Sequence, residues 1–91
     1  MWARRVERSA QFWRCYAELK PSVPRMDEIL EGIEWSIMVD PEGWRKVPDT
    51  QLWGAWSDPF PDAPTLAVYF TIDDPGQCTM VWVEEAAAQE S

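Results

Sequence analysis

The order of the predicted secondary-structure elements indicates an α+β fold, in which a pair of helices packs on a mainly antiparallel sheet in the order β-α-α-β-β-β. Two observations predict it. Between residues 9 and 39, apolar residues recur with the period of a helix, and after residue 50 they alternate as in strands. At 91 residues we expect one domain, at residues 1–85, followed by a C-terminal tail at 86–91.

The first part of the chain is predicted to hold a short strand and a helix. Residues 2–8 alternate between two faces, as in a strand, and Ser9 is a favourable N-cap for the helix that follows. Pro21 ends this helix. Its apolar stripe consists of Phe12, Cys15, Tyr16 and Leu19.

The second helix is expected to begin at Ser22 or Val23, with Pro24 tolerated in its first turn. It should end near Val39, because Asp40 precedes a proline and is therefore disfavoured in a helix. Its apolar stripe is Met26, Ile29, Leu30, Ile33 and Ile37, and its acidic outer face is Asp27, Glu28, Glu31 and Glu34. The two helices therefore form an antiparallel pair.

The remaining residues are predicted to form a loop at 42–50 and three strands at 51–57, 65–72 and 77–84, with a proline-rich connection at 58–64 and a turn at 73–76. In the first of these strands, Trp56 shares a face with Gly54 and lies opposite Trp53. In the last, Cys78, Met80 and Trp82 should share one face. Both hairpin strands carry apolar residues on both faces, which indicates either strands inside the sheet or a second face that another part covers.

Charge is distributed unevenly. The chain carries 8 Lys and Arg against 16 Asp and Glu, a net charge of −8. Residues 1–46 hold all 8 basic and 8 acidic residues, whereas residues 47–91 hold 8 acidic residues and no basic one. Nonspecific nucleic-acid binding needs a cationic surface, so we do not expect the C-terminal half to contact nucleic acid.

Several kinds of site are excluded by residue type. The chain has no His, which removes His-dependent nucleophilic catalysis and His-based metal sites. Cys15 and Cys78 are far apart, lack metal-site spacing and are expected to be buried apolar residues. No signal peptide or membrane span is visible, so we expect a cytoplasmic protein. We expect no cofactor or metal, because nothing in the spacing of Asp and Glu supports the one alternative, a metal site made only of carboxylates.

Four segments carry a resemblance to the RelE/ParE superfamily of bacterial toxin–antitoxin toxins, covering about positions 2–85. They are Val6-Glu-Arg-Ser9 leading into Gln11-Phe12, residues 33–42 at the end of the second helix, Val47-Pro-Asp-Thr-Gln-Leu52, and Leu66-Ala-Val-Tyr-Phe-Thr-Ile-Asp73. The resemblance implies a small toxin that either cleaves ribosome-bound mRNA or inhibits a protein such as gyrase, and that is held by a cognate antitoxin.

The chain departs from this family on the sheet. Where the family often has Leu-Arg-x-x-Arg, this chain has Leu52-Trp-Gly-Ala-Trp56, and no Arg or Lys follows Lys46. Attack of a ribose hydroxyl on phosphate needs a base, an acid and cations near the phosphorus. The remaining candidates for such roles are Arg45, Lys46 and Tyr69; the alternatives are a solvated loop for the basic pair and sheet packing for the tyrosine.

Four tryptophans are candidates for partner binding, because Trp is enriched at binding hot spots: Trp44, Trp53, Trp56 and Trp82. The alternative is that they pack beneath the helices or cover the sheet. The N-terminal part of the chain also holds a cluster of arginines, Arg4, Arg5, Arg8 and Arg14. We expect this arginine cluster to pair with Glu7 and Glu18 rather than to bind nucleic acid.

Three functions remain open. The first is a toxin-family protein that acts through contact with an antitoxin or a cellular target. The second is a non-toxic interaction module, and the third is a ribosome-dependent mRNA endoribonuclease. Because the C-terminal half is acidic, the contacting segment of a partner should be basic. The excess of Trp and the two apolar faces of the hairpin also suggest a homodimer or a permanent partner.

Overall fold

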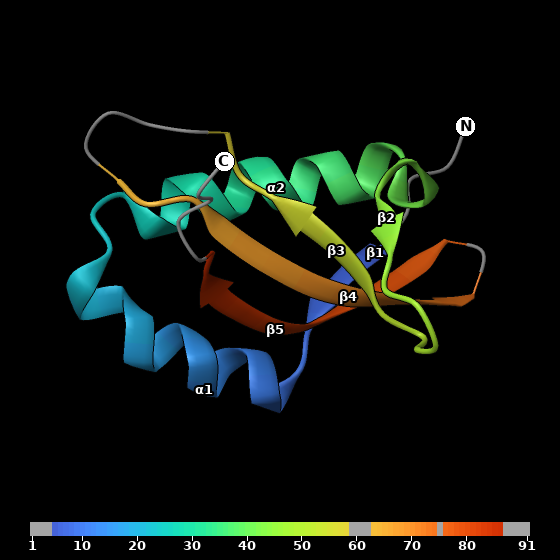
Figure 1. Cartoon of the computed structure of the whole chain (residues 1–91), viewed down its shortest axis with the longest axis horizontal. Helices are drawn as coiled ribbons and strands as arrows, with labels where there is room; N and C mark the ends of the chain where they lie inside the picture. The colour runs from blue at the N-terminus through green and yellow to red at the C-terminus, as the bar shows by residue number, and fades with distance from the viewer. Residues whose placement is uncertain (1–4, 59–62, 75, 87–91) are drawn as a thin grey trace.

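The computed structural model describes residues 5–58, 63–74 and 76–86, and it is an α+β fold of two helices packed on a five-stranded mixed sheet (Figure 1). The elements are β1 (Arg5–Arg8), α1 (Ala10–Leu19), α2 (Met26–Val39), β2 (Arg45–Lys46), β3 (Trp53–Trp56), β4 (Leu66–Asp74) and β5 (Gln77–Glu85), with 3₁₀ turns at Lys20–Ser22 and Pro41–Gly43. The predicted class and element order are therefore correct, apart from one additional strand.

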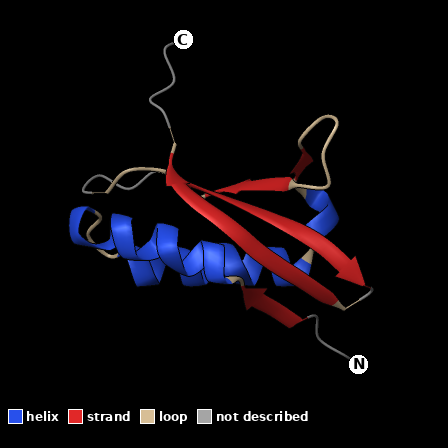
Figure 2. Cartoon of the chain, turned by 90° about the horizontal axis from the view of Figure 1, so that it is seen from below, coloured by secondary structure: helices blue, strands red, loops and turns tan. Residues whose placement is uncertain are grey.

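The strand order is β1-β5-β4-β3-β2. β1 lies parallel to β5, and the other three pairings are antiparallel. The helices lie to one side of the long β4–β5 hairpin (Figure 2). The prediction that both hairpin strands are interior is confirmed, since β5 and β4 each have a strand on both sides.

The first helix begins as expected: the Ser9 hydroxyl accepts a hydrogen bond from the backbone N–H of Phe12 at 3.1 Å. The second helix begins later than expected, at Met26 instead of Ser22 or Val23. Val23 has an extended backbone and Arg25 a left-handed one, with φ of 61°. The two prolines of this segment, at 21 and 24, favour a break in the helical path over a continuous second helix.

The core lies between the helices and one face of the sheet. The predicted stripe of α2 is buried in full, and Phe12 and Cys15 of α1 are buried beside it. The sheet contributes Leu66, Val68 and Phe70 from β4 and Cys78, Met80 and Val83 from β5. Both cysteines are free thiols within this core, as expected.

The segment 42–50, predicted to be a loop, contains β2. Arg45 pairs with Gly54 and Lys46 with Trp53, and the Val47 N–H donates to the Leu52 carbonyl at 2.8 Å. Two residues are too few to show an alternating pattern in the sequence, so only pairing with β3 identifies this strand.

A β-bulge corrects the predicted faces of β5. Tyr69 pairs with Trp82 but its neighbour Phe70 pairs with Met80, so Val81 is an extra residue in β5. Because an extra residue inverts the alternation beyond it, Val83 enters the core while Trp82 is turned outward and is 40% exposed. The expectation that Trp82 shares a face with Cys78 and Met80 is therefore wrong.

The arginine cluster pairs differently from the prediction. Arg5 forms an ion pair with Glu7, as expected. Arg8 instead pairs with Glu34 of α2, with Nη2 2.9 Å from Oε1, and its guanidinium lies over the rings of Phe12 and Trp13. This contact joins β1 to both α1 and α2. The expected pairing with Glu18, a residue of α1, would not have reached α2.

Some predictions lie outside the described residues. These are the first part of the N-terminal strand with Arg4, most of the proline-rich connection at 58–64, one residue of the turn at 73–76, and nearly all of the C-terminal tail.

Candidate functional site

The face of the sheet that points away from the helices, called here the open face, carries a row of paired residues across four strands. Arg45 of β2 pairs with Gly54 of β3, Gly54 pairs with Tyr69 of β4, and Tyr69 pairs with Trp82 of β5. Paired residues of neighbouring strands share a face, so these positions form one line. Since Gly54 has no side chain, the Tyr69 ring extends over it.

A hollow of about 510 Å³, called here the open-face hollow, lies around Tyr69 and Trp82. Its lining is mainly apolar and aromatic, with a polar amide at one side and a carboxylate at another: Gln11, Val47, Leu52, Tyr69, Val81, Trp82 and Glu84. The bulge that adds Val81 also turns Trp82 into this hollow. A concave, mostly apolar site with a few polar groups is typical of a binding surface.

Glu84 connects the two aromatic residues of the hollow. Its carboxylate accepts a hydrogen bond from the Trp82 indole N–H at 3.0 Å. Burial raises the pKa of the Tyr69 phenol above its ordinary value of 10.0, and the charge of Glu84 and a hydrogen bond to it act in the same direction. Tyr69 is therefore a protonated hydroxyl at neutral pH, suited to donating a hydrogen bond and not to accepting a proton.

The three candidates for catalysis are not brought together. Arg45 and Tyr69 share the cross-sheet row, whereas Lys46 pairs with Trp53 and belongs to the other face. Phosphoryl chemistry needs several positive groups around the phosphate, and the open-face hollow has an aliphatic and aromatic lining with a carboxylate in it.

The four tryptophans predicted to bind a partner occupy three places. Trp82 lines the open-face hollow. Trp53 is half-buried and packs against the core, which is the alternative considered for it. Trp44 and Trp56 both line a hollow of about 150 Å³ between α2 and the outer edge of β3, although the end of the Trp56 ring lies beside Gly54 on the open face.

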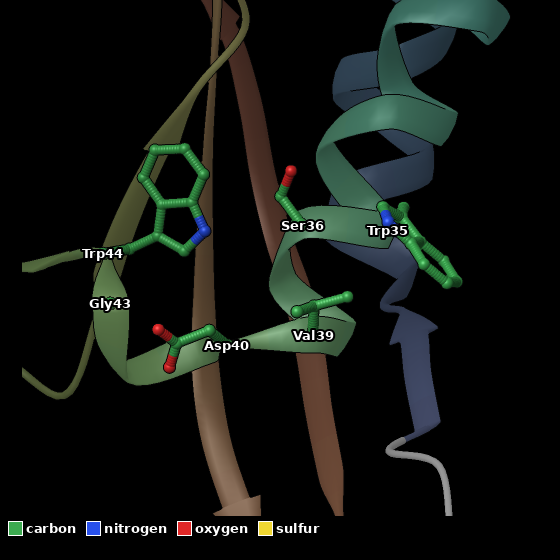
Figure 3. Close-up of a pocket in the computed structure, with 6 residues that line it drawn as sticks. All are labelled: Trp35, Ser36, Val39, Asp40, Gly43 and Trp44. Carbon is green, nitrogen blue, oxygen red and sulfur yellow. The ribbon is translucent and has the colours of Figure 1, made fainter.

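This small hollow adjoins a second one of about 330 Å³ at the end of α2, and Ser36 and Trp44 line both. Figure 3 shows Trp44 across from Ser36 and Val39, with Asp40 below them and Trp35 extending away from Trp44 at the rim. We call the combined feature the α2 groove. Its lining is Glu28, Ile29, Gly32, Ile33, Trp35, Ser36, Val39, Asp40, Gly43, Trp44, Trp56, Ser57 and Asp58.

Sequence reasoning missed Trp35 and Val39 as surface contacts, although they are 64% and 60% exposed. A signal was available. Neither belongs to the apolar stripe of α2, so each places a large apolar side chain on the outer side of an otherwise acidic helix. An apolar residue out of phase with the buried stripe is a usable indicator of an interaction surface.

Comparisons with known proteins give no family for this chain: no family model, no curated protein and no solved structure matches it. Within the part of the chain that the structure describes, no group of three or more Cys, Asp and Glu residues is arranged to hold a metal ion. None of its described helices is long and apolar enough to cross a membrane.

Proposed function

We propose that this protein is a RelE/ParE-like toxin-family protein that acts through contact with another protein instead of cleaving RNA. One observation carries the proposal. The open face of the sheet presents an apolar and aromatic hollow around Tyr69 and Trp82, and among the described residues its one titratable lining residue besides Tyr69 is the carboxylate Glu84. Such a surface suits an apolar side chain of a protein partner and repels phosphate.

The family assignment is supported by the local sequence resemblance and by the arrangement of the elements. The resemblance implies a first strand, a helical pair and then a sheet. The observed order β1-α1-α2 followed by β2 to β5, with helices on one face and the other face open, agrees with it.

The partner we propose is an antitoxin-like protein with a basic contacting segment. The sheet half of the chain has 8 acidic residues and no basic residue after Lys46. Association should therefore slow as salt rises, because electrostatic steering is screened. An association rate that does not change between low and high salt would remove the electrostatic part of this proposal.

The test is induction of the chain in a bacterial host, beside two variants checked for folding by circular dichroism. Wild type should arrest growth, and Trp82→Ala should relieve the arrest because it removes an aromatic wall of the open-face hollow. The matched control is Trp13→Ala. Trp13 is an exposed tryptophan of α1, away from the open-face hollow, and this variant should still arrest growth. No arrest by wild type would favour the non-toxic interaction module.

A second candidate, an mRNA endoribonuclease, is favoured by the cross-sheet row. Arg45 and Tyr69 lie on the same face with only Gly54 between them, so an arginine and a protonated phenol could both approach one phosphate. In that case induction would produce cleaved mRNA, and both Arg45→Ala and Tyr69→Phe would abolish cleavage.

A further inference from the structure

We propose that the α2 groove is a second docking surface, separate from the open-face hollow, and that it binds a basic segment of a partner protein carrying apolar anchor residues. The groove runs along the outer side of α2 and is bordered by the edge of β3. Among the described residues it shares no lining residue with the open-face hollow, so the argument does not depend on the function proposed for the open face.

The two hollows of the groove adjoin each other at α2. These hollows, of about 330 and 150 Å³, share Ser36 and Trp44. The groove is open at Gly32, where a Cβ atom built on the backbone meets no atom within 4 Å. Glycine is unfavourable inside a helix, so its presence in α2 leaves space at a cost in helix stability.

The walls of the groove expose apolar surface. Trp35 and Val39 lie exposed at one end, and Trp56 lines the other end, with its ring turned toward Gly54. A run of exposed large apolar residues on one surface is a mark of an interaction site. Leucine-like or aromatic side chains of a partner would remove this surface from water.

The charge of the groove selects a basic occupant. Asp40 and Asp58 are exposed at its two ends, and neither forms an ion pair with a cation among the described residues. Glu28 also lines the groove, but Arg25 holds its carboxylate with two hydrogen bonds of 3.0 Å. No basic residue lines the groove in the described part of the chain, so it favours lysine and arginine and repels nucleic acid.

The edge of β3 adds a backbone surface to the groove. β2 pairs only with Trp53 and Gly54, so Ala55 and Trp56 have no strand beside them on the outer side within the described residues. An extended partner segment can hydrogen-bond to such an edge. A second copy of this chain fits less well, because it would bring the same pair of carboxylates toward an acidic groove.

The experiment uses the full-length chain and two fluorescent peptides of equal length, one built of lysine and leucine and the other of glutamate and leucine. Wild type should bind the lysine peptide and not the glutamate peptide. Gly32→Lys places a cationic side chain inside the groove and should weaken binding by about tenfold or more. Glu31→Gln raises the net charge equally but lies outside the groove, and it should change the affinity by less than about twofold.

Two further variants locate the contact. Trp35→Ala should weaken binding of the lysine peptide by about tenfold, as at an interface hot spot. Trp82→Ala, in the open-face hollow, should leave it unchanged. Trp35 is largely exposed, so its replacement does not disturb the core.

The proposal is overturned by any of four results. The first is failure of wild type to bind the lysine peptide, and the second is equal binding of the glutamate peptide. The third is an equal effect of Gly32→Lys and Glu31→Gln on the affinity, which would indicate attraction by net charge alone. The fourth is a dimer of wild type that Trp35→Ala dissociates in sedimentation, which would make a second copy the occupant.

Discussion

The ring of Tyr69 lies over Gly54, with its Cε1 atom 3.3 Å from the position that a Cβ atom at Gly54 would occupy. The end of the Trp56 ring approaches the same position to 2.9 Å. Glycine is therefore needed at this point of β3 for packing on the open face, and it allows Tyr69 to reach along the row toward Arg45.

Gly54→Ala should consequently destabilise the fold by about 1 kcal/mol, because the added methyl group displaces the Trp56 ring and crowds Tyr69. Urea denaturation gives the change in the free energy of unfolding. The control is the same substitution in a Trp56→Ala background, where the closest contact is gone and the cost should shrink. An equal cost in both backgrounds would contradict this packing.

The bulge in β5 makes a prediction about two neighbouring valines. Val83 is buried and Val81 lines the open-face hollow. Val83→Ala should cost about 2 kcal/mol of unfolding free energy, as for a large-to-small change in a core. Val81→Ala should cost less than about 1 kcal/mol, as for a surface change. Similar costs of the two substitutions in urea denaturation would mean that β5 alternates without a bulge, because residues two apart would then share a face.

Arg8 links three elements through one side chain, since it pairs with Glu34 and lies over Phe12 and Trp13. A double-mutant cycle of Arg8→Met and Glu34→Gln should yield a coupling energy of about 1 kcal/mol, because the pair is partly buried and hydrogen-bonded. Arg5→Met with Glu7→Gln, an exposed pair, is the control and should show weaker coupling. Equal coupling energies of the two pairs would show that the partial burial of the Arg8–Glu34 pair does not strengthen it.

Tyr69 should titrate above 10.0, because burial and Glu84 both raise its pKa. The chain has two tyrosines, so ultraviolet titration of a Tyr16→Phe variant follows Tyr69 alone. The protonated phenol is favoured in the folded state. Its contribution to stability is therefore complete below the unfolded-state pKa and is lost as pH rises through the folded-state pKa.

Glu84→Gln is the matched variant for this titration. It removes the charge while keeping an oxygen for the Trp82 N–H, and it should lower the pKa of Tyr69 without restoring it fully, since burial is the larger cause. A Tyr69 that titrates at or below 10.0 in the folded protein would contradict the placement of its hydroxyl in the hollow.

The elements that sequence predicts well are those whose pattern is long. The stripe of α2 extends over three turns and was predicted residue by residue, as was the Ser9 cap of α1. β2 was missed because two residues carry no period, and the outward turn of Trp82 because a bulge depends on pairing between strands that no local pattern records.

For the candidate sites too, sequence predicts what a local pattern records and misses what depends on tertiary contacts. Alternation correctly separated Trp53 from Trp56 in β3. It could not bring Trp56 beside Trp44, which lies in a different segment, nor join either to Trp35 on α2. The α2 groove exists only after the helix has been packed against the edge of the sheet, so residues far apart in sequence become neighbours through tertiary structure.

The central claim, action through protein contact without RNA cleavage, is tested most directly by mapping the ends of cellular mRNA after induction of the wild-type chain in a bacterial host. The account predicts growth arrest that Trp82→Ala relieves, with no new mRNA ends at ribosome-bound positions. New ends at those positions that disappear in Arg45→Ala would contradict it and establish the endoribonuclease.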